Sequence, residues 1–176
     1  MCAIRPAVPG DLPGITAIYN DAILKTTATF HTKPRTADEQ RRWFASHDAR
    51  HPVVVAHESG EIIGWASLSP YSDRPAYDDT AEVSVYVRED RRGRGVGALL
   101  MRDVLARGRA LSLHAVVARI VGGNEPSVRL HASAGFERVG VLREVGRKFG
   151  RLLDVLVMEL VLPGPGADSS ESGRSR

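Results

Sequence analysis

The 176-residue sequence has one cysteine and no long apolar run. Cys2 cannot form a disulfide within the chain, which favours a reducing compartment such as the cytoplasm. No apolar stretch approaches the roughly 20 residues that a membrane-spanning helix requires, and residues 1–6 lack the charged and apolar blocks of a signal peptide. We therefore expect a cytoplasmic protein with no membrane partner.

A strong charge of one sign is also absent. The 24 basic and 21 acidic residues give a formal net charge of +3, and the basic residues are not interleaved with aromatic ones, so no nucleic-acid partner is expected. The positive charge is concentrated at Arg88, Arg91, Arg92 and Arg94, which favours a small anionic ligand. The six histidines are scattered at no recognisable metal-binding spacing, so no metal is expected either.

The hydrophobic pattern predicts one mixed α/β domain over residues 1–162, followed by a Pro/Gly/Ser-rich tail over 163–176 that we expect to be disordered. Asp11 and Thr36 are the predicted N-caps of the first two helices, and Glu39 completes a capping box with Thr36. The predicted helices span 11–23, 36–46, 95–111 and 124–134, and the predicted strands span 52–58, 61–69, 81–87, 114–121, 136–144 and 153–161.

A segment rich in glycine and arginine joins the strand predicted at 81–87 to the helix predicted at 95–111. Glycine lets the backbone approach a ligand closely, and a helix N-terminus favours an anion. The segment lacks the Lys-Ser/Thr pair of one familiar phosphate loop, and Ala98 stands where the dinucleotide-binding pattern needs a glycine. We interpret it as a pyrophosphate-binding loop, with a solvated basic turn as the alternative. Its residues are Arg92, Gly93, Arg94, Gly95, Val96 and Gly97.

This R-x-x-G-x-G segment resembles the loop with which the GNAT acyltransferases hold the pyrophosphate of acetyl-CoA. A second block, NEPSVRLHASAGFERVG, resembles the GNAT segment in which Asn124 and Ser127 would face the CoA arm. Further segments, IYNDAILKTTATF, RPAYDDTAEVSVYV and KFGRLLDV, are similar to those of the phosphinothricin and methionine-sulfoximine N-acetyltransferases. The resemblance covers residues 3–162. It implies a mostly antiparallel mixed sheet flanked by helices, acetyl-CoA as co-substrate, and a homodimer.

Attack of an amine on a thioester is helped by a base, because part of an α-amine is protonated at neutral pH. Glu82 lies in a β-branched strand, where a glutamate is unfavourable unless its face is wet or its charge is used. In the resembling group, a glutamate at this position is regarded as the general base. His131, two helical turns after Asn124, is the second candidate. The alternatives are a solvent-facing Glu82 and a partly buried His131 bonded to the backbone.

The cofactor and oxyanion contacts are expected along the same strand. A backbone N–H of Val85, Tyr86 or Val87 is the simplest donor to the developing oxyanion. Tyr86 also alternates onto the face of Glu82. No Ser-His-Asp order or Cys-His pair indicates a covalent intermediate, so we expect direct transfer in a ternary complex.

The acceptor contacts rest on the resemblance. It implies that Arg74 holds a carboxylate or phosphinate bidentately, that Tyr77 adds a hydroxyl donor, and that Thr29 and Phe30 line the acceptor site. The predicted function is transfer of acetyl to the α-amine of a small acceptor such as phosphinothricin, methionine sulfone or methionine sulfoximine. Acetylation of a protein N-terminus and a non-catalytic acetyl-CoA-binding module are the alternatives.

One departure from the resembling group concerns the acceptor. Leu152 and Leu153 follow KFGR, where the group commonly has an aromatic residue. This change leaves the exact amino acid open.

Overall fold

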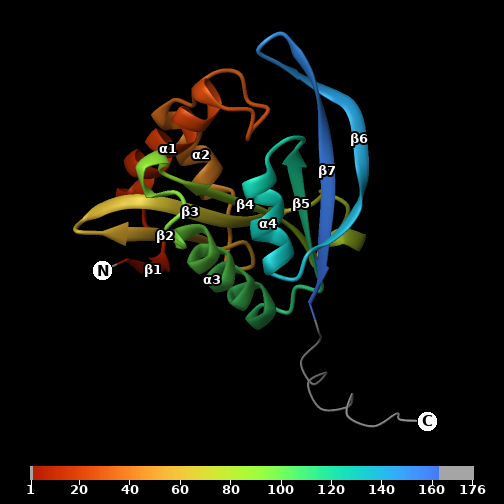
Figure 1. The fold of residues 1–176 in the computed structure, drawn as a ribbon. Helices are drawn as coiled ribbons and strands as arrows, with labels where there is room; N and C mark the ends of the chain where they lie inside the picture. Colours follow the sequence, from red (N-terminus) through yellow and green to blue (C-terminus); the bar gives the residue numbers. More distant parts are fainter. Residues whose placement is uncertain (1, 163–176) are drawn as a thin grey trace.

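The computed structural model describes residues 2–162 (Figure 1). The tail predicted at 163–176 lies outside the described residues. No helix in the described part of the chain is long and apolar enough to cross a membrane. In chain order, the main elements are β1 (Ala3–Pro6), α1 (Leu12–Lys25), α2 (Ala37–Ala45), β2 (Val53–Glu58), β3 (Glu61–Pro70), β4 (Thr80–Val87), α3 (Val96–Ala110), β5 (Ala115–Val121), α4 (Glu125–Ser133), β6 (Glu137–Lys148) and β7 (Arg151–Val161).

The strands form a single seven-stranded sheet in the order β1-β2-β3-β4-β5-β7-β6. Neighbouring strands are antiparallel except β4 and β5, which are parallel because α3 connects them. The predicted mixed and mostly antiparallel α/β fold is therefore confirmed. The parallel pair is short: its register runs only from Thr80↔Ala115 to Glu82↔Val117.

The core forms two layers because side chains alternate across the sheet. Val54 faces one side, where it packs in a cluster with Leu100 and Val104 of α3 and Val128 of α4. The neighbours of Val54 in β2 face the other side, where they pack with α1 and Trp65. In Figure 1, α1 and α2 lie on one face of the sheet, and α3 and α4 cover the opposite face.

The helix starts confirm one predicted cap and correct another. Thr36 Oγ1 accepts from the Glu39 N–H at 3.2 Å, and Glu39 accepts from the Thr36 N–H at 2.7 Å, as a capping box requires. Asp11 does not cap α1, because residues 9–11 form a 3₁₀ turn and Asp11 itself has helical angles. Its carboxylate accepts instead from the Val8 N–H at 2.8 Å and pairs bidentately with Arg5, which lowers the pKa of Asp11.

The closing hairpin is longer than the sequence pattern predicted. β6 and β7 extend to a two-residue turn at Phe149 and Gly150, both with positive φ (50° and 73°), as tight hairpin turns of the primed types require. Two register shifts in β6, at 138/140 and 142/146, break the alternation on which the prediction depended. The four-residue edge strand β1 was missed because it is too short to show a period.

Candidate active site

The site lies where β4 and β5 separate. Beyond Glu82↔Val117 the two strands no longer pair, so the backbone edges of Val83–Val87 and Ala118–Val121 face a gap in the sheet. One cavity of about 740 Å³ lies toward α3 and α4, and a second of about 550 Å³ lies toward α1 and β6. The two cavities share lining residues, so a molecule in the first can present a group to the second. These shared residues are Ala28, Val85, Tyr86, Asn124 and Ser127.

The larger cavity is built on the glycine-rich loop. Gly93 and Gly95 have φ of 73° and 79°, which non-glycine residues rarely adopt. Gly95 is the N-cap of α3 and has no side-chain cap, and the first hydrogen bond of the helix runs from the Leu99 N–H to the Gly95 carbonyl. The N–H groups of the first helical turn therefore point out of the helix end as donors for an anion.

Arginine side chains surround this donor set. Four of them line the larger cavity, and no Asp or Glu among residues 2–162 does. Arg92 is fixed by donating Nε to the Val87 carbonyl at 3.1 Å, while the buried Nε of Arg91 has no hydrogen-bond partner among the described residues. Arg94, which was predicted to bind the cofactor, is not a lining residue. Two that are, Arg129 and Arg151, were missed because they are distant in sequence from the loop.

The smaller cavity contains the candidate base Glu82. Its carboxylate is paired bidentately with the guanidinium of Arg119 on β5: Arg119 Nε donates to Glu82 Oε1 at 2.9 Å, and Nη2 donates to Oε2. The Glu82 side chain is 23% exposed and that of Arg119 is 54% exposed. Sequence reasoning missed Arg119, although a charged residue in the apolar strand 114–121 is the same signal that identified Glu82.

The other candidate base, His131, also lines the smaller cavity but is only 5% exposed. It donates Nδ1–H to the Ser127 carbonyl at 2.8 Å, so the neutral ring keeps Nε2 as an acceptor. Burial lowers the pKa of His131, with the Ser127 contact opposing the shift. The edge of its ring meets Phe136 at a centroid distance of 5.1 Å. This backbone-bonded histidine matches the alternative given for His131, and it also leaves a neutral basic nitrogen.

Tyr86 connects the two cavities. It stacks on Trp65 with ring centroids 4.8 Å apart, and its hydroxyl donates to the Ala28 carbonyl at 3.5 Å. Burial, and secondarily the neighbouring Tyr19, raise the pKa of the Tyr86 phenol. The hydroxyl therefore stays protonated, and in this structure its hydrogen is directed to the Ala28 carbonyl.

Comparison with known proteins identifies the family. Residues 15–136 match the model of the acetyltransferase (GNAT) family. The chain belongs to this GNAT family. It is 44% identical over 165 residues to the L-methionine sulfoximine/L-methionine sulfone acetyltransferase of Pseudomonas paraeruginosa, covering 91% of this chain and 94% of that protein. It is 45% identical over 156 residues to the phosphinothricin N-acetyltransferase of Streptomyces coelicolor, covering 86% and 91%.

A solved structure agrees with this assignment. The GNAT-superfamily phosphinothricin acetyltransferase of Sinorhizobium meliloti, in complex with acetyl-CoA, superimposes with a TM-score of 0.90 at 33% identity, covering 97% of this chain and 94% of that one. The present chain is thus an acetyl-CoA-dependent N-acetyltransferase of the GNAT type, as the sequence motifs predicted.

The larger cavity of this GNAT enzyme suits acetyl-CoA. The backbone donors at Gly95–Ala98 fit a pyrophosphate, and the four arginines match the further negative charge of a CoA phosphate. Bound there, acetyl-CoA supplies the acetyl group as a thioester. Asn124 and Ser127 line both cavities, and Asn124 Oδ1 accepts from the Ser127 N–H at 3.3 Å and caps α4.

The predicted acceptor residues divide into two groups. Thr29 and Phe30 line the smaller cavity, on the loop that follows α1. Arg74 and Tyr77 line neither cavity: Tyr77 is exposed and packs edge-on against Tyr71, with ring centroids 5.2 Å apart. In this arrangement the GNAT domain does not bring the Arg74–Tyr77 turn together with Glu82.

The hairpin between β6 and β7 fixes the acceptor-side loop of the GNAT domain. Lys148, 3% exposed, donates Nζ to the Thr29 carbonyl at 2.7 Å, and its burial lowers its pKa. Gly146 lies directly against the Phe30 ring, since a Cβ at that position would come within 2.5 Å of it. Two leucines follow this hairpin turn. Leu152 is exposed, whereas Leu153 is buried and lines the larger cavity.

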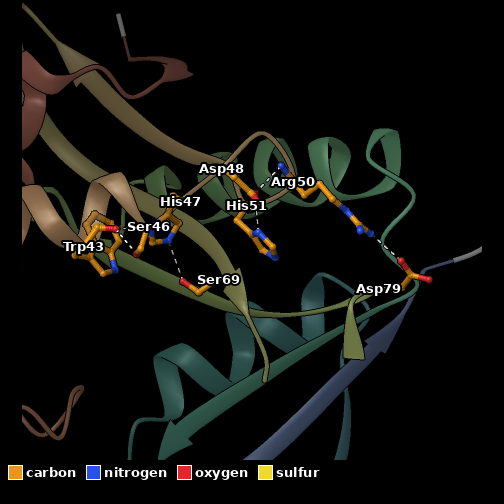
Figure 2. A network of polar contacts seen from close by, with 8 residues as sticks. All are labelled: Trp43, Ser46, His47, Asp48, Arg50, His51, Ser69 and Asp79. Atoms are coloured by element: carbon orange, nitrogen blue, oxygen red, sulfur yellow. Dashed lines mark hydrogen bonds and ion pairs between the residues drawn. The ribbon is translucent and has the colours of Figure 1, made fainter. Parts of the chain in front are cut away.

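A polar network fixes the strand ends behind the site (Figure 2). His47 donates Nδ1–H to the Trp43 carbonyl at 2.8 Å and accepts at Nε2 from the Ser69 hydroxyl at 3.0 Å. Ser69 is the β3 residue that pairs with the predicted base. Arg50 donates to Asp79 at 2.7 Å, directly before β4 begins. The end of α2 and the loop after it thus hold both strands in register at the candidate base.

Proposed function

We propose that the enzyme transfers the acetyl group of acetyl-CoA to the α-amine of a small amino-acid-like acceptor, of the phosphinothricin, methionine sulfone or methionine sulfoximine type, by direct attack in a ternary complex. The observation that carries this proposal is the junction of the two cavities. The larger cavity suits a polyanion, and the smaller one contains an ion pair, Glu82 with Arg119, and opens on the same Tyr86. The substrates in the names of the relatives described above support the same acceptor class.

The proposed reaction begins with proton removal. Glu82 takes a proton from the acceptor ammonium, directly or through water, and the amine nitrogen then attacks the thioester carbon. The C–N bond forms, the carbonyl oxygen becomes an oxyanion, and a backbone N–H of the unpaired β4 edge at 85–87 donates to it. As the C–S bond breaks, the thiolate accepts a proton. The ammonium and the thioester are thereby converted into an amide, a thiol and one released proton. We propose that Tyr86, still protonated, turns its hydroxyl from the Ala28 carbonyl to donate a hydrogen bond at this step.

The test is a thiol-release assay with acetyl-CoA over a panel of amino acids that includes phosphinothricin, methionine sulfone and methionine sulfoximine. We expect turnover on at least one of these three and little on a peptide with a free N-terminus. Turnover only on the peptide would replace the small acceptor by a protein N-terminus. Acetyl-CoA binding without turnover on either would indicate a binding module.

We also propose a cytoplasmic homodimer. The single Cys2 supports a reducing compartment. The outer strand β6 leaves apolar side chains exposed, among them Val139, Val141 and Val145, and a second copy could cover them. Light scattering at micromolar concentration should give twice the chain mass. A monomer there would contradict the dimer without affecting the proposed chemistry.

A further inference from the structure

The acceptor cavity contains an arginine that the proposed chemistry has not used. Arg119 projects from β5 into the smaller cavity, where its Nε and Nη2 both contact the carboxylate of Glu82. The Arg119 side chain is 54% exposed and lines the cavity, so an incoming ligand can reach it. Guanidinium groups bind carboxylates in this forked geometry, and one carboxylate can replace another in it.

The charges that line this cavity are few. Among the described residues, Glu82 and Arg119 are the only Asp, Glu, Lys or Arg side chains that line it. Its two histidines, His31 and His131, have pKa values lowered mainly by burial, which favours their neutral forms. The lining therefore holds one anion beside one cation. A zwitterionic α-amino acid is complementary to this pair, because its ammonium can face Glu82 while its carboxylate faces Arg119.

We propose that Arg119 recognises the carboxylate of the acceptor by exchanging Glu82 for it, so that Glu82 is released to take the ammonium proton when an α-amino acid enters. This inference rests on the proposed function and deepens it. Arg119 keeps a bidentate carboxylate partner before and after the exchange, and the freed Glu82 meets the ammonium. An amine without a carboxylate gains only the Glu82 contact and leaves the guanidinium without an anion, so it is a poorer acceptor.

This assignment differs from the expectation that Arg74 binds the carboxylate. Arg74 is the N-terminal flanking residue of the short 3₁₀ turn Pro75–Tyr77 and lines neither cavity. Arg119 lines the same cavity as the candidate base and touches it. Carboxylate recognition within one chain therefore falls to Arg119.

The experiment compares acceptors that differ only in the carboxylate. The kcat/KM of the purified full chain is measured on L-methionine sulfone and on the amide of this amino acid. If L-methionine sulfone is not turned over, another amino acid that the panel shows to be a substrate is compared with its own amide. We expect the wild-type enzyme to prefer the acid, and Arg119→Gln to reduce that preference at least tenfold, mainly by raising KM for the acid. Arg119→Lys should fall in between, because it keeps the charge and loses the fork.

Two further arginine variants provide the controls. Arg107→Gln removes an arginine that pairs with Asp103 on α3 and lines neither cavity, and it should keep the wild-type preference. Arg74→Gln tests the rival assignment: loss of the preference there and not in Arg119→Gln overturns the inference. Unchanged acetyl-CoA affinity and an unchanged unfolding temperature establish that Arg119→Gln is folded.

The remaining outcomes are decisive. A wild-type acid-to-amide ratio in Arg119→Gln overturns the inference and leaves the proposed function standing. An equal loss on acid and amide also overturns it, because Arg119 would then only orient Glu82. If the wild-type enzyme turns over no amino acid, the proposed function fails first, and the carboxylate assignment fails with it.

Discussion

Replacing Glu82 by glutamine separates the catalytic role of this residue from its structural one. The change keeps the shape and one hydrogen-bond acceptor for Arg119 but removes the basic carboxylate. Because the two side chains are 23% and 54% exposed, water screens the lost ion pair, and the cost in folding stability should be under about 1 kcal/mol. Loss of a general base costs roughly 10²–10⁴ in turnover, which corresponds to about 2.7–5.4 kcal/mol of barrier.

The assay is steady-state thiol release at several pH values, with acetyl-CoA affinity measured calorimetrically on the same protein. We expect kcat to fall by roughly 10²–10⁴-fold at neutral pH. The affinity for acetyl-CoA should barely change, since Glu82 does not line the larger cavity. The defect should narrow at high pH, where the acceptor amine is already neutral.

His131→Asn, measured alongside, tests the competing base. Asparagine can keep the donor to the Ser127 carbonyl while it removes the Nε2 acceptor. A larger loss there than in Glu82→Gln would refute the assignment of the base to Glu82. Near-normal rates in both variants would mean that the acceptor arrives neutral and that neither residue is the base.

Three further predictions follow from the contacts around the site. Gly95→Val forces a branched residue to φ 79° at the N-terminus of α3, so the affinity for acetyl-CoA should fall at least tenfold while circular dichroism still shows a folded protein. An unchanged affinity measured by calorimetry would contradict the assignment of this loop to pyrophosphate binding. Lys148→Met removes the donor to the Thr29 carbonyl, so KM for the acceptor should rise severalfold while KM for acetyl-CoA changes little. Lys25→Met removes an exposed lysine of α1 that pairs with Asp21, and it should change neither KM. An unchanged acceptor KM in Lys148→Met would show that the hairpin does not position the loop. Burial lowers the pKa of His47 in the folded state, so as pH falls the unfolded chain binds a proton before the folded one does. The free energy of unfolding should therefore fall by up to about 1.4 kcal/mol per pH unit as pH drops below about 6.5. Urea unfolding of His47→Asn should show a weaker dependence of stability on pH than the wild type, and an equal dependence would refute this.

The fold was largely predictable because its elements carry local signals. The Thr36 capping box and the alternation in 81–87 each depend on neighbouring residues alone, and each appears in the structure. The prediction failed where a longer-range contact decides the outcome. Asp11 turns away from the helix because Arg5 and the turn before it offer better partners.

The site was predictable to the extent that its residues lie in one segment. Glu82 lies within β4 and the glycine loop follows that strand, so sequence order places them close together. Arg119 of β5, Arg129 of α4 and Arg151 of β7 reach the cavities from elements that only the tertiary fold brings near β4. No spacing in the sequence reports that order. An isolated charge in an apolar strand was the one available signal, and Arg119 carried it.

The brief parallel pairing of β4 with β5 has a consequence for folding. Strands β1–β4 and β5–β7 are each joined to their neighbours by antiparallel pairing, whereas strand pairing between the two groups is limited to three residue pairs, 80–82 with 115–117. Such a junction is expected to open at lower free energy than either group alone. The larger cavity has lining residues on both sides of this junction, so CoA bound there would contact both groups of strands and stabilise the junction between them. Amide hydrogen exchange at residues 80–82 and 115–117 should therefore slow more than elsewhere in the sheet when CoA is present.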